Sequence, residues 1–222
     1  MGKIRFVVFD CDGTLIDSLA LIAEAAGEAL AAHGIAPPSL GAVRRVVGMP
    51  LEEAIATLAQ DADPVRLAAL ADAYRSRYHA LRTAPGAAEP LFPGARAVLD
   101  RLRAEGILIG MATNKGRRGV DAVLATHDLE GHFAVLRTAD DGPAKPDPFL
   151  LVDAMAEAGM GAHETVLVGD TIYDMAMARA AGTGALGVAW GYHAPEELSR
   201  AGALAVIEDF EALHSHLGEE GP

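Results

Sequence analysis

Short, almost continuously apolar segments recur along this chain, and several of them stop abruptly at polar residues. Their length and their β-branched and aromatic content are typical of strands that are buried on both faces of a sheet. They lie at residues 4–9, 107–112, 133–136, 165–168, 185–190 and 203–207. Each segment is therefore predicted to form a strand.

Amphipathic helical patterns separate the later segments. Residues 93–105 place Val98, Leu99 and Leu102 on one face and stop at Gly106, and similar patterns occupy 117–127 and 148–159. Strands that alternate with helices predict βαβ units and a parallel sheet. The expected fold class is therefore α/β, with a Rossmann-like sheet covered by helices on both faces.

The alternation is interrupted directly after the first predicted strand. From residue 17 to about residue 82 the pattern is helical throughout, and residues 83–93 have the Ala-, Pro- and Gly-rich composition of a hinge. We therefore predict an all-helical domain, residues 17–83, inserted into an α/β domain formed by residues 1–16 and 84–222.

Charge and cysteine content exclude several classes of protein. The formal net charge is −13, which argues against nucleic-acid binding because phosphate backbones select basic surfaces. The lone Cys11 excludes a disulfide framework and a cysteine-built zinc site. We find no signal peptide and no apolar stretch of membrane-spanning length, so we expect a soluble cytoplasmic protein, either a monomer or a homodimer.

Polar side chains that are suited to phosphate chemistry follow the predicted strands. They are Asp10, Asp12, Thr113, Asn114, Lys145, Asp170 and Asp174. Parallel sheets bind ligands at this edge, and carboxylates gathered there need a cation, for which oxygen-rich sites favour Mg²⁺. One aspartate could attack phosphorus, while a second, two residues further on, could protonate the leaving oxygen and then activate water. The set predicts a metal-assisted phosphohydrolase.

Four motifs carry a family resemblance. Segment 9–18, FDCDGTLIDS, resembles the first motif of the haloacid dehalogenase superfamily, and segments 112–114, 144–148 and 168–174 resemble the second, third and fourth in order. Segment 91–94, LFPG, resembles the stretch that re-enters the core after a helical cap. The chain is most similar to the phosphoglycolate-phosphatase-like branch.

The resemblance implies a role for each motif residue. Asp10 corresponds to the nucleophile and Asp12 to the general acid and base. Thr113, the Asn114 backbone and Lys145 would hold the phosphate, with Lys145 also paired to Asp10.

The resemblance also implies a Mg²⁺ cofactor. Its ligands would be Asp10, the backbone carbonyl of Asp12, Asp170 and Asp174, the last directly or through water. The implied activity is hydrolysis of a small soluble phosphomonoester, phosphoglycolate-like, through an aspartyl-phosphate. The cap would close over the substrate and exclude water.

Other activities remain open at this stage. A pyrophosphatase and a sugar phosphomutase of the β-phosphoglucomutase type are alternatives, although residues 48–53 lack the arginine that such mutases usually carry after the cap glycine. A carbon–halogen hydrolase is disfavoured because a halide leaves without a proton and does not need Asp12. A non-catalytic phosphate-binding module is disfavoured because every motif is complete.

A few further residues have two interpretations. Arg44, Arg45 and Met49 are candidates for substrate contact, weighed against a solvated cap surface. Tyr74 and Tyr78, one helical turn apart, are interpreted as packing within the cap. Arg117 and Arg118, which follow the second motif, are weighed as anion-steering residues against the solvated start of a helix, and the solvated helix start is favoured.

Overall fold

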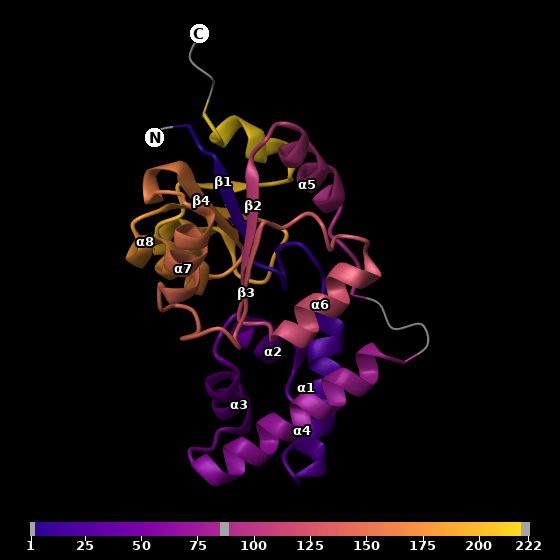
Figure 1. Cartoon of the computed structure of the whole chain (residues 1–222). Coiled ribbons are helices and arrows are strands. Elements are labelled where there is room, and N and C mark those ends of the chain that lie inside the picture. The colour runs from indigo at the N-terminus through magenta and orange to yellow at the C-terminus, as the bar shows by residue number, and fades with distance from the viewer. Residues whose placement is uncertain (1–2, 85–88, 219–222) are drawn as a thin grey trace.

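The computed structural model of the chain describes residues 3–84 and 89–218. In these residues, six strands form one parallel sheet in the order β3-β2-β1-β4-β5-β6 (Figure 1). The strands are β1 (Phe6–Phe9), β2 (Leu108–Ala112), β3 (Val135–Arg137), β4 (Thr165–Gly169), β5 (Gly184–Val188) and β6 (Ala205–Ile207). The predicted α/β class and parallel sheet are confirmed.

Helices cover both faces of this sheet, as the apolar runs of its strands require. In β1 the side chains alternate between the faces: Val7 and Phe9 pack with α5 and α6, and Phe6 and Val8 pack with α7 and α8. The covering helices are α5 (Ala95–Ala104), α6 (Arg117–Thr126), α7 (Phe149–Ala158), α8 (Ile172–Ala181) and α9 (Pro195–Ala201), with 3₁₀ turns η1 (Ala162–Glu164) and η2 (Glu211–His216).

The strand order places a topological switch point beside β1. From β1 the chain runs outward through β2 to β3 and then crosses to β4, on the other side of β1. The two strands stay paired to their ends, where the Asp10 N–H donates to the Val168 carbonyl at 2.9 Å. Ligands bind parallel sheets at such points, so the fold itself selects this edge for the site.

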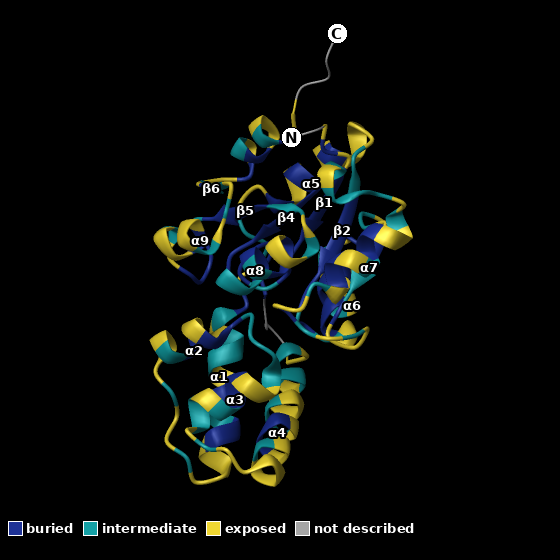
Figure 2. Ribbon diagram, turned by 90° about the vertical axis from the view of Figure 1, so that its left-hand side faces the viewer, coloured by how far each residue is buried: buried dark blue, intermediate teal, exposed yellow. Residues whose placement is uncertain are grey.

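Four helices lie beyond the carboxyl end of β1, and we call them the cap (Figure 1). They are α1 (Leu19–Ala32), α2 (Leu40–Val46), α3 (Leu51–Ala59) and α4 (Pro64–Arg82). Leu30, Ile55 and Leu70 form a small core among them, separate from the clusters that cover the sheet. In α4 the buried residues are Leu70 and Ala71, and most of the rest of the helix is exposed or intermediate (Figure 2). None of the helices in the described part of the chain is both long and apolar enough to span a membrane.

The chain leaves and re-enters the α/β core at one place. Ile16, before the cap, forms an antiparallel bridge with Leu91, after it, and the Asp17 N–H donates to the Pro90 carbonyl at 2.8 Å. Residues 85–88 of the predicted hinge lie outside the described residues.

Several strands are shorter than, or shifted from, their apolar segments. Ile4 is buried, but its N–H donates to the Leu217 carbonyl at 2.9 Å, and β1 begins only at Phe6. In the same way β3 begins at Val135, opposite Gly110, two residues later than the apolar run. Apolar content predicts burial, whereas the neighbouring strand sets where pairing begins and ends.

Candidate active site

Three buried carboxylates meet at the switch point. Asp10 follows β1, Asp170 follows β4, and Asp174 lies in the first turn of α8. One oxygen from each lies within 4.8 Å of the others, and all three residues are buried. The structure therefore brings together three of the four predicted metal ligands by their side chains.

Lys145 supplies the counter-charge to this group. Its ammonium lies 2.8 Å from Asp10 Oδ1 and 2.6 Å from Asp174 Oδ1, and its side chain is fully buried. The other Asp174 oxygen accepts hydrogen bonds from the Thr171 N–H at 3.0 Å and the Thr171 hydroxyl at 2.6 Å. Asp174 thus caps α8 and pairs with Lys145 at the same time.

Asp170 is held from two sides. The Thr14 hydroxyl donates to Oδ1 at 3.0 Å, and the Tyr192 N–H donates to Oδ2 at 2.9 Å. A Cβ atom at Gly13 would lie 2.2 Å from Asp170 Oδ2, and one at Gly191 would lie 2.1 Å from Asp170 Cβ. Glycine is therefore required on both sides of this carboxylate.

Burial and mutual repulsion set the protonation of these groups. Burial and the neighbouring Asp174 together raise the pKa of Asp10 to about 6, against the attraction of Lys145. Burial, with the neighbouring charges of Asp174 and Asp10, raises the pKa of Asp170 well above its usual range. For Lys145, burial opposes the charge, but Asp10 and Asp174 outweigh it and raise its pKa. Without a cation the site therefore favours protonated carboxyls, and with all three ionised it would carry more negative charge than its lysine can neutralise.

This donor set fits a hard divalent cation. Lys145 pairs with Asp10 and Asp174, so with all three carboxylates ionised two negative charges lack a counter-charge among the described side chains. Carboxylate oxygens are the ligands that Mg²⁺ prefers, and its charge would balance the excess. Asp10, Asp170 and Asp174 are the side chains that would hold it.

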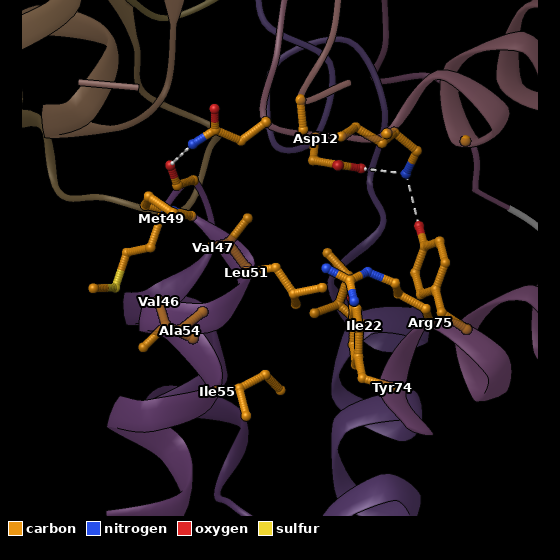
Figure 3. Close-up of a pocket in the computed structure, with 18 of the residues that line it drawn as sticks. Asp12, Ile22, Val46, Val47, Met49, Leu51, Ala54, Ile55, Tyr74 and Arg75 are labelled. Carbon is orange, nitrogen blue, oxygen red and sulfur yellow. Dashed lines mark hydrogen bonds and ion pairs between the residues drawn. The ribbon is translucent and has the colours of Figure 1, made fainter. Parts of the chain in front are cut away.

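Asp12 belongs to a neighbouring cluster that sequence reasoning missed. Its Oδ1 accepts a hydrogen bond from Lys115 Nζ at 2.8 Å, and the same ammonium contacts the Tyr78 hydroxyl at 2.7 Å (Figure 3). The ammonium also contacts Glu89 Oε1 at 2.9 Å. Burial opposes the charge on Lys115. Asp12, Tyr78 and other neighbouring groups outweigh this effect and raise the pKa of Lys115 well above its usual range. The position of Lys115 directly after the second motif is the one signal that could have identified it.

The second motif lies between the two clusters. Thr113 is buried, accepts from the Lys115 N–H at 3.2 Å, and its hydroxyl lowers the pKa of Asp10. The Asn114 side chain donates to the Gly48 carbonyl of the cap at 2.9 Å and accepts from the Lys145 N–H at 2.9 Å. Asn114 thus joins the third motif to the cap.

A cavity of about 590 Å³ opens between the core and the cap. Asp10, Asp12 and Thr113 line it from the core, and mostly apolar side chains of the cap, among them Met49, line the other side (Figure 3). Arg118 also lines it, which agrees with the less favoured of its two interpretations, a residue that faces anions.

Arg44 is exposed on the cap surface, the second of its two predicted environments, and it does not line the cavity. Its guanidinium donates to the Tyr192 carbonyl at 2.8 Å and the Gly191 carbonyl at 2.5 Å, so it joins α2 of the cap to the loop that holds Asp170. The rings of Tyr74 and Tyr78, which we expected to pack within the cap, stack on each other with centroids 5.7 Å apart, while the Tyr78 hydroxyl also reaches the core.

Known proteins resemble the chain over nearly its whole length. The sequence pattern of the haloacid dehalogenase-like hydrolases matches residues 7–188. A phosphoglycolate phosphatase of Rhodospirillum rubrum is 34% identical over 227 residues, which cover 98% of this chain and 92% of that protein. A phosphoglycolate phosphatase of Pseudomonas putida is 33% identical over 220 residues, which cover 94% and 78%.

A solved structure also resembles the chain over nearly its whole length. The crystal structure of a hydrolase from Pseudomonas syringae superposes with a TM-score of 0.84 at 31% identity, over 97% of both chains. The matched segment contains the three acidic residues, Lys145 and the cluster around Asp12. The chain therefore belongs to the haloacid dehalogenase-like hydrolase family, in its phosphoglycolate-phosphatase-like branch, and is a hydrolase of phosphoric monoesters.

Proposed function

We propose that this protein is a Mg²⁺-dependent phosphatase that hydrolyses a small soluble phosphomonoester through an aspartyl-phosphate on Asp10. One observation carries the proposal: Asp10 lies at the switch point, paired with Lys145 at 2.8 Å, beside Asp170 and Asp174, and lines a cavity large enough for a small ester. When bound, Mg²⁺ would offset the charge of the carboxylates and the phosphoryl oxygens.

The proposed reaction has two displacements. An Asp10 carboxylate oxygen forms a bond to phosphorus while the bond from phosphorus to the leaving oxygen breaks, and Asp12 donates its proton to that oxygen. Water then attacks phosphorus, Asp12 takes back a proton from it, and the bond to Asp10 breaks to release phosphate. In both displacements Lys145 and Thr113 stabilise the negative charge of the phosphoryl group and keep it in position.

In this proposal residues 17–83 act as a lid on the α/β core formed by 1–16 and 84–222. Two observations support this role for residues 17–83. The walls of the cavity come from both parts of the chain, and Asn114 and Arg44 make contacts between the two parts. A closed lid excludes water and so protects the aspartyl-phosphate until the leaving alcohol has departed.

The cavity wall favours a substrate with a second anionic group, such as phosphoglycolate. Arg82 and Arg118 line it, and among the described residues neither has a carboxylate partner, whereas Arg75 on the same wall pairs with two. Partial burial and these two guanidinium groups lower the pKa of His79, whose ring contacts Arg118 at 2.7 Å. A carboxylate in the cavity would supply the missing counter-charge.

The test is phosphate release from a panel of esters with Mg²⁺, with EDTA, and with Asp10→Asn. The panel pairs 2-phosphoglycolate with 2-hydroxyethyl phosphate, which lacks only the carboxylate, and adds pyrophosphate and glucose 1-phosphate. We expect EDTA and Asp10→Asn each to leave less than about 1% of turnover, a barrier increase of roughly 2.7 kcal/mol. The aspartyl-phosphate proposal fails if Asp10→Asn keeps more.

Variants at the cavity wall test the substrate class. Arg82→Met and Arg118→Met should raise KM for 2-phosphoglycolate by at least about tenfold, and leave KM for 2-hydroxyethyl phosphate within about threefold. Arg75→Met, whose charge is already paired, is the matched control. Equal KM changes for both esters would contradict the second anionic group, and preferred turnover of pyrophosphate or conversion of the sugar phosphate would favour the alternative activities.

A further inference from the structure

The Lys115 ammonium is hydrogen-bonded both to Asp12 in the core and to Tyr78 in the cap. Its side chain is 5% exposed, and its three N–H groups are matched by three partners: Asp12 Oδ1 at 2.8 Å, the Tyr78 hydroxyl at 2.7 Å and Glu89 Oε1 at 2.9 Å. An ammonium offers three donors, so this set is complete. Lys115 therefore has no donor left for a substrate.

Its partners come from three different parts of the chain. Asp12 follows β1 in the core, Tyr78 lies on α4 of the cap, and Glu89 lies on the connection that returns from the cap. The Tyr78 hydroxyl donates to Glu89 while it accepts from Lys115, and the Glu89 carbonyl contacts the His127 ring at 2.8 Å. A single ammonium thus joins the core, the cap and the connection between them.

The contact leaves half of the Asp12 carboxylate available. In the described part of the chain, Lys115 is the partner found for Oδ1, no hydrogen bond to Oδ2 is found, and Asp12 lines the cavity. An acid and base that must reach a leaving oxygen and then a water needs one oxygen fixed and the other free. Figure 3 shows Asp12 at the cavity edge with dashed lines to the ammonium and on to the phenol.

We propose that Lys115 is a positioning residue for Asp12, and that Tyr78 makes this positioning depend on a closed cap. The proposal rests on the proposed function and adds to it the means by which cap closure reaches the acid and base. When the cap is closed, Tyr78 and Glu89 fix the ammonium, and the ammonium fixes Asp12 Oδ1. When α4 moves away, the ammonium loses one of its three partners and Asp12 loses its fixed orientation.

A comparison of leaving groups isolates this role. In the first displacement Asp12 protonates the leaving oxygen, which an alkyl ester requires and p-nitrophenyl phosphate hardly does. The parameter kcat/KM covers only the steps up to release of the alcohol, so the later attack of water does not mask the difference. For Lys115→Met we expect kcat/KM to fall roughly 100-fold for 2-hydroxyethyl phosphate, and by less than about threefold for p-nitrophenyl phosphate.

The same pattern should appear in related variants. Asp12→Asn should lower kcat/KM for the alkyl ester at least as much as Lys115→Met does, and should again affect the aryl ester little. The double variant Asp12→Asn with Lys115→Met should have no lower kcat/KM for the alkyl ester than Asp12→Asn alone. Arg117→Met removes a positive charge two residues away that pairs with Asp121 on the surface, and it should change neither ester.

A second pair of variants keeps the test decisive if Lys115→Met does not fold. Tyr78→Phe retains the Lys115–Glu89 pair and removes one hydroxyl, and should lower kcat/KM for the alkyl ester roughly tenfold more than for the aryl ester. Tyr74→Phe, on the ring stacked against Tyr78, should affect both esters alike. Equal losses on the two esters in Lys115→Met and Tyr78→Phe would overturn the inference.

That failure differs from failure of the proposed function. If the wild type hydrolyses both esters and Asp10→Asn hydrolyses neither, the aspartyl-phosphate chemistry stands and only the role of Lys115 is refuted. If Asp10→Asn keeps its turnover, the proposed function itself is refuted.

Discussion

Replacing Gly13 with alanine should weaken the proposed cation site as well as the fold, and three glycines allow the two effects to be separated. Gly13 has φ +83°, and a Cβ atom there would lie 2.2 Å from Asp170 Oδ2. Gly94 has φ +84°, but its Cβ would meet Phe210 at an ordinary 3.5 Å. Gly191 is not in the left-handed region, yet its Cβ would lie 2.1 Å from Asp170 Cβ. An alanine would therefore meet both backbone strain and a steric clash at Gly13, backbone strain alone at Gly94, and a steric clash alone at Gly191.

The expected costs follow from these geometries. A left-handed backbone costs an alanine about 1–2 kcal/mol, which is the whole expected loss of stability in Gly94→Ala. Overpacking costs about 1–3 kcal/mol, which is the expected loss in Gly191→Ala. Gly13→Ala should lose about 2–5 kcal/mol because both terms apply. For a chain of this length each kcal/mol lowers Tm by roughly 2–4 °C.

The assay combines thermal unfolding in EDTA with a Mg²⁺ titration of phosphate release. In Gly13→Ala and Gly191→Ala the displaced Asp170 should raise the half-saturating Mg²⁺ concentration by at least about tenfold, equivalent to about 1.4 kcal/mol of lost binding. In Gly94→Ala that concentration should not change. If all three variants share one Mg²⁺ titration curve, or if Gly13→Ala is no less stable than Gly94→Ala, the argument that these glycines accommodate Asp170 is wrong.

Three further predictions concern charge and packing. Because burial raises the pKa of Asp10 from 3.8 to about 6, folding favours its neutral form, and the metal-free protein should lose up to about 3 kcal/mol of stability as pH rises from about 4 to about 6. Asp10→Asn should flatten that slope in urea unfolding. Lys145→Met leaves Asp10 and Asp174 without their ammonium, so we expect a loss of about 3–5 kcal/mol in EDTA and a larger rise of Tm on adding Mg²⁺ than in the wild type. Gly110→Ala would place a Cβ 2.6 Å from Phe6 Cζ in the sheet, costing about 1–3 kcal/mol that Phe6→Leu should partly restore.

Each of these has a clear contradicting result. A metal-free stability that rises between pH 4 and 6, or a slope that Asp10→Asn leaves intact, would contradict the assigned burial of Asp10. An unaltered Tm in Lys145→Met would mean that the ion pairs are not formed in solution. Additive losses in the double variant Gly110→Ala with Phe6→Leu would show that the ring and the glycine do not share one space.

Much of the fold and of the carboxylate site follows from local sequence. The apolar runs predict strands, and the alternation with helices makes the sheet parallel, so Asp10 and Asp170 had to emerge at one edge. That reasoning does not use the order of the strands in the sheet. It therefore locates the site correctly, but it does not predict where β1 and β3 begin. Strand ends depend on pairing partners that are distant in the sequence.

The cluster around Asp12 could not be predicted in the same way. Lys115 and Asp12 are separated by 103 residues, and Glu89 lies in a segment without periodicity that we interpreted only as a hinge. For Tyr78 the helical period correctly predicts packing on Tyr74, but it says which face a ring occupies and not what its hydroxyl reaches. Long polar side chains find partners through the assembled fold, which local patterns do not encode.

The bridge between Ile16 and Leu91 has a consequence for how such proteins diversify. Because the chain leaves and re-enters the core side by side, everything between is, for the sheet, an insertion at a single turn. The entropy of closing such an insertion grows only slowly with its length, by about 0.6 kcal/mol for each doubling. The inserted helices can therefore be lengthened, shortened or exchanged without altering the register of any strand or the residues at its end.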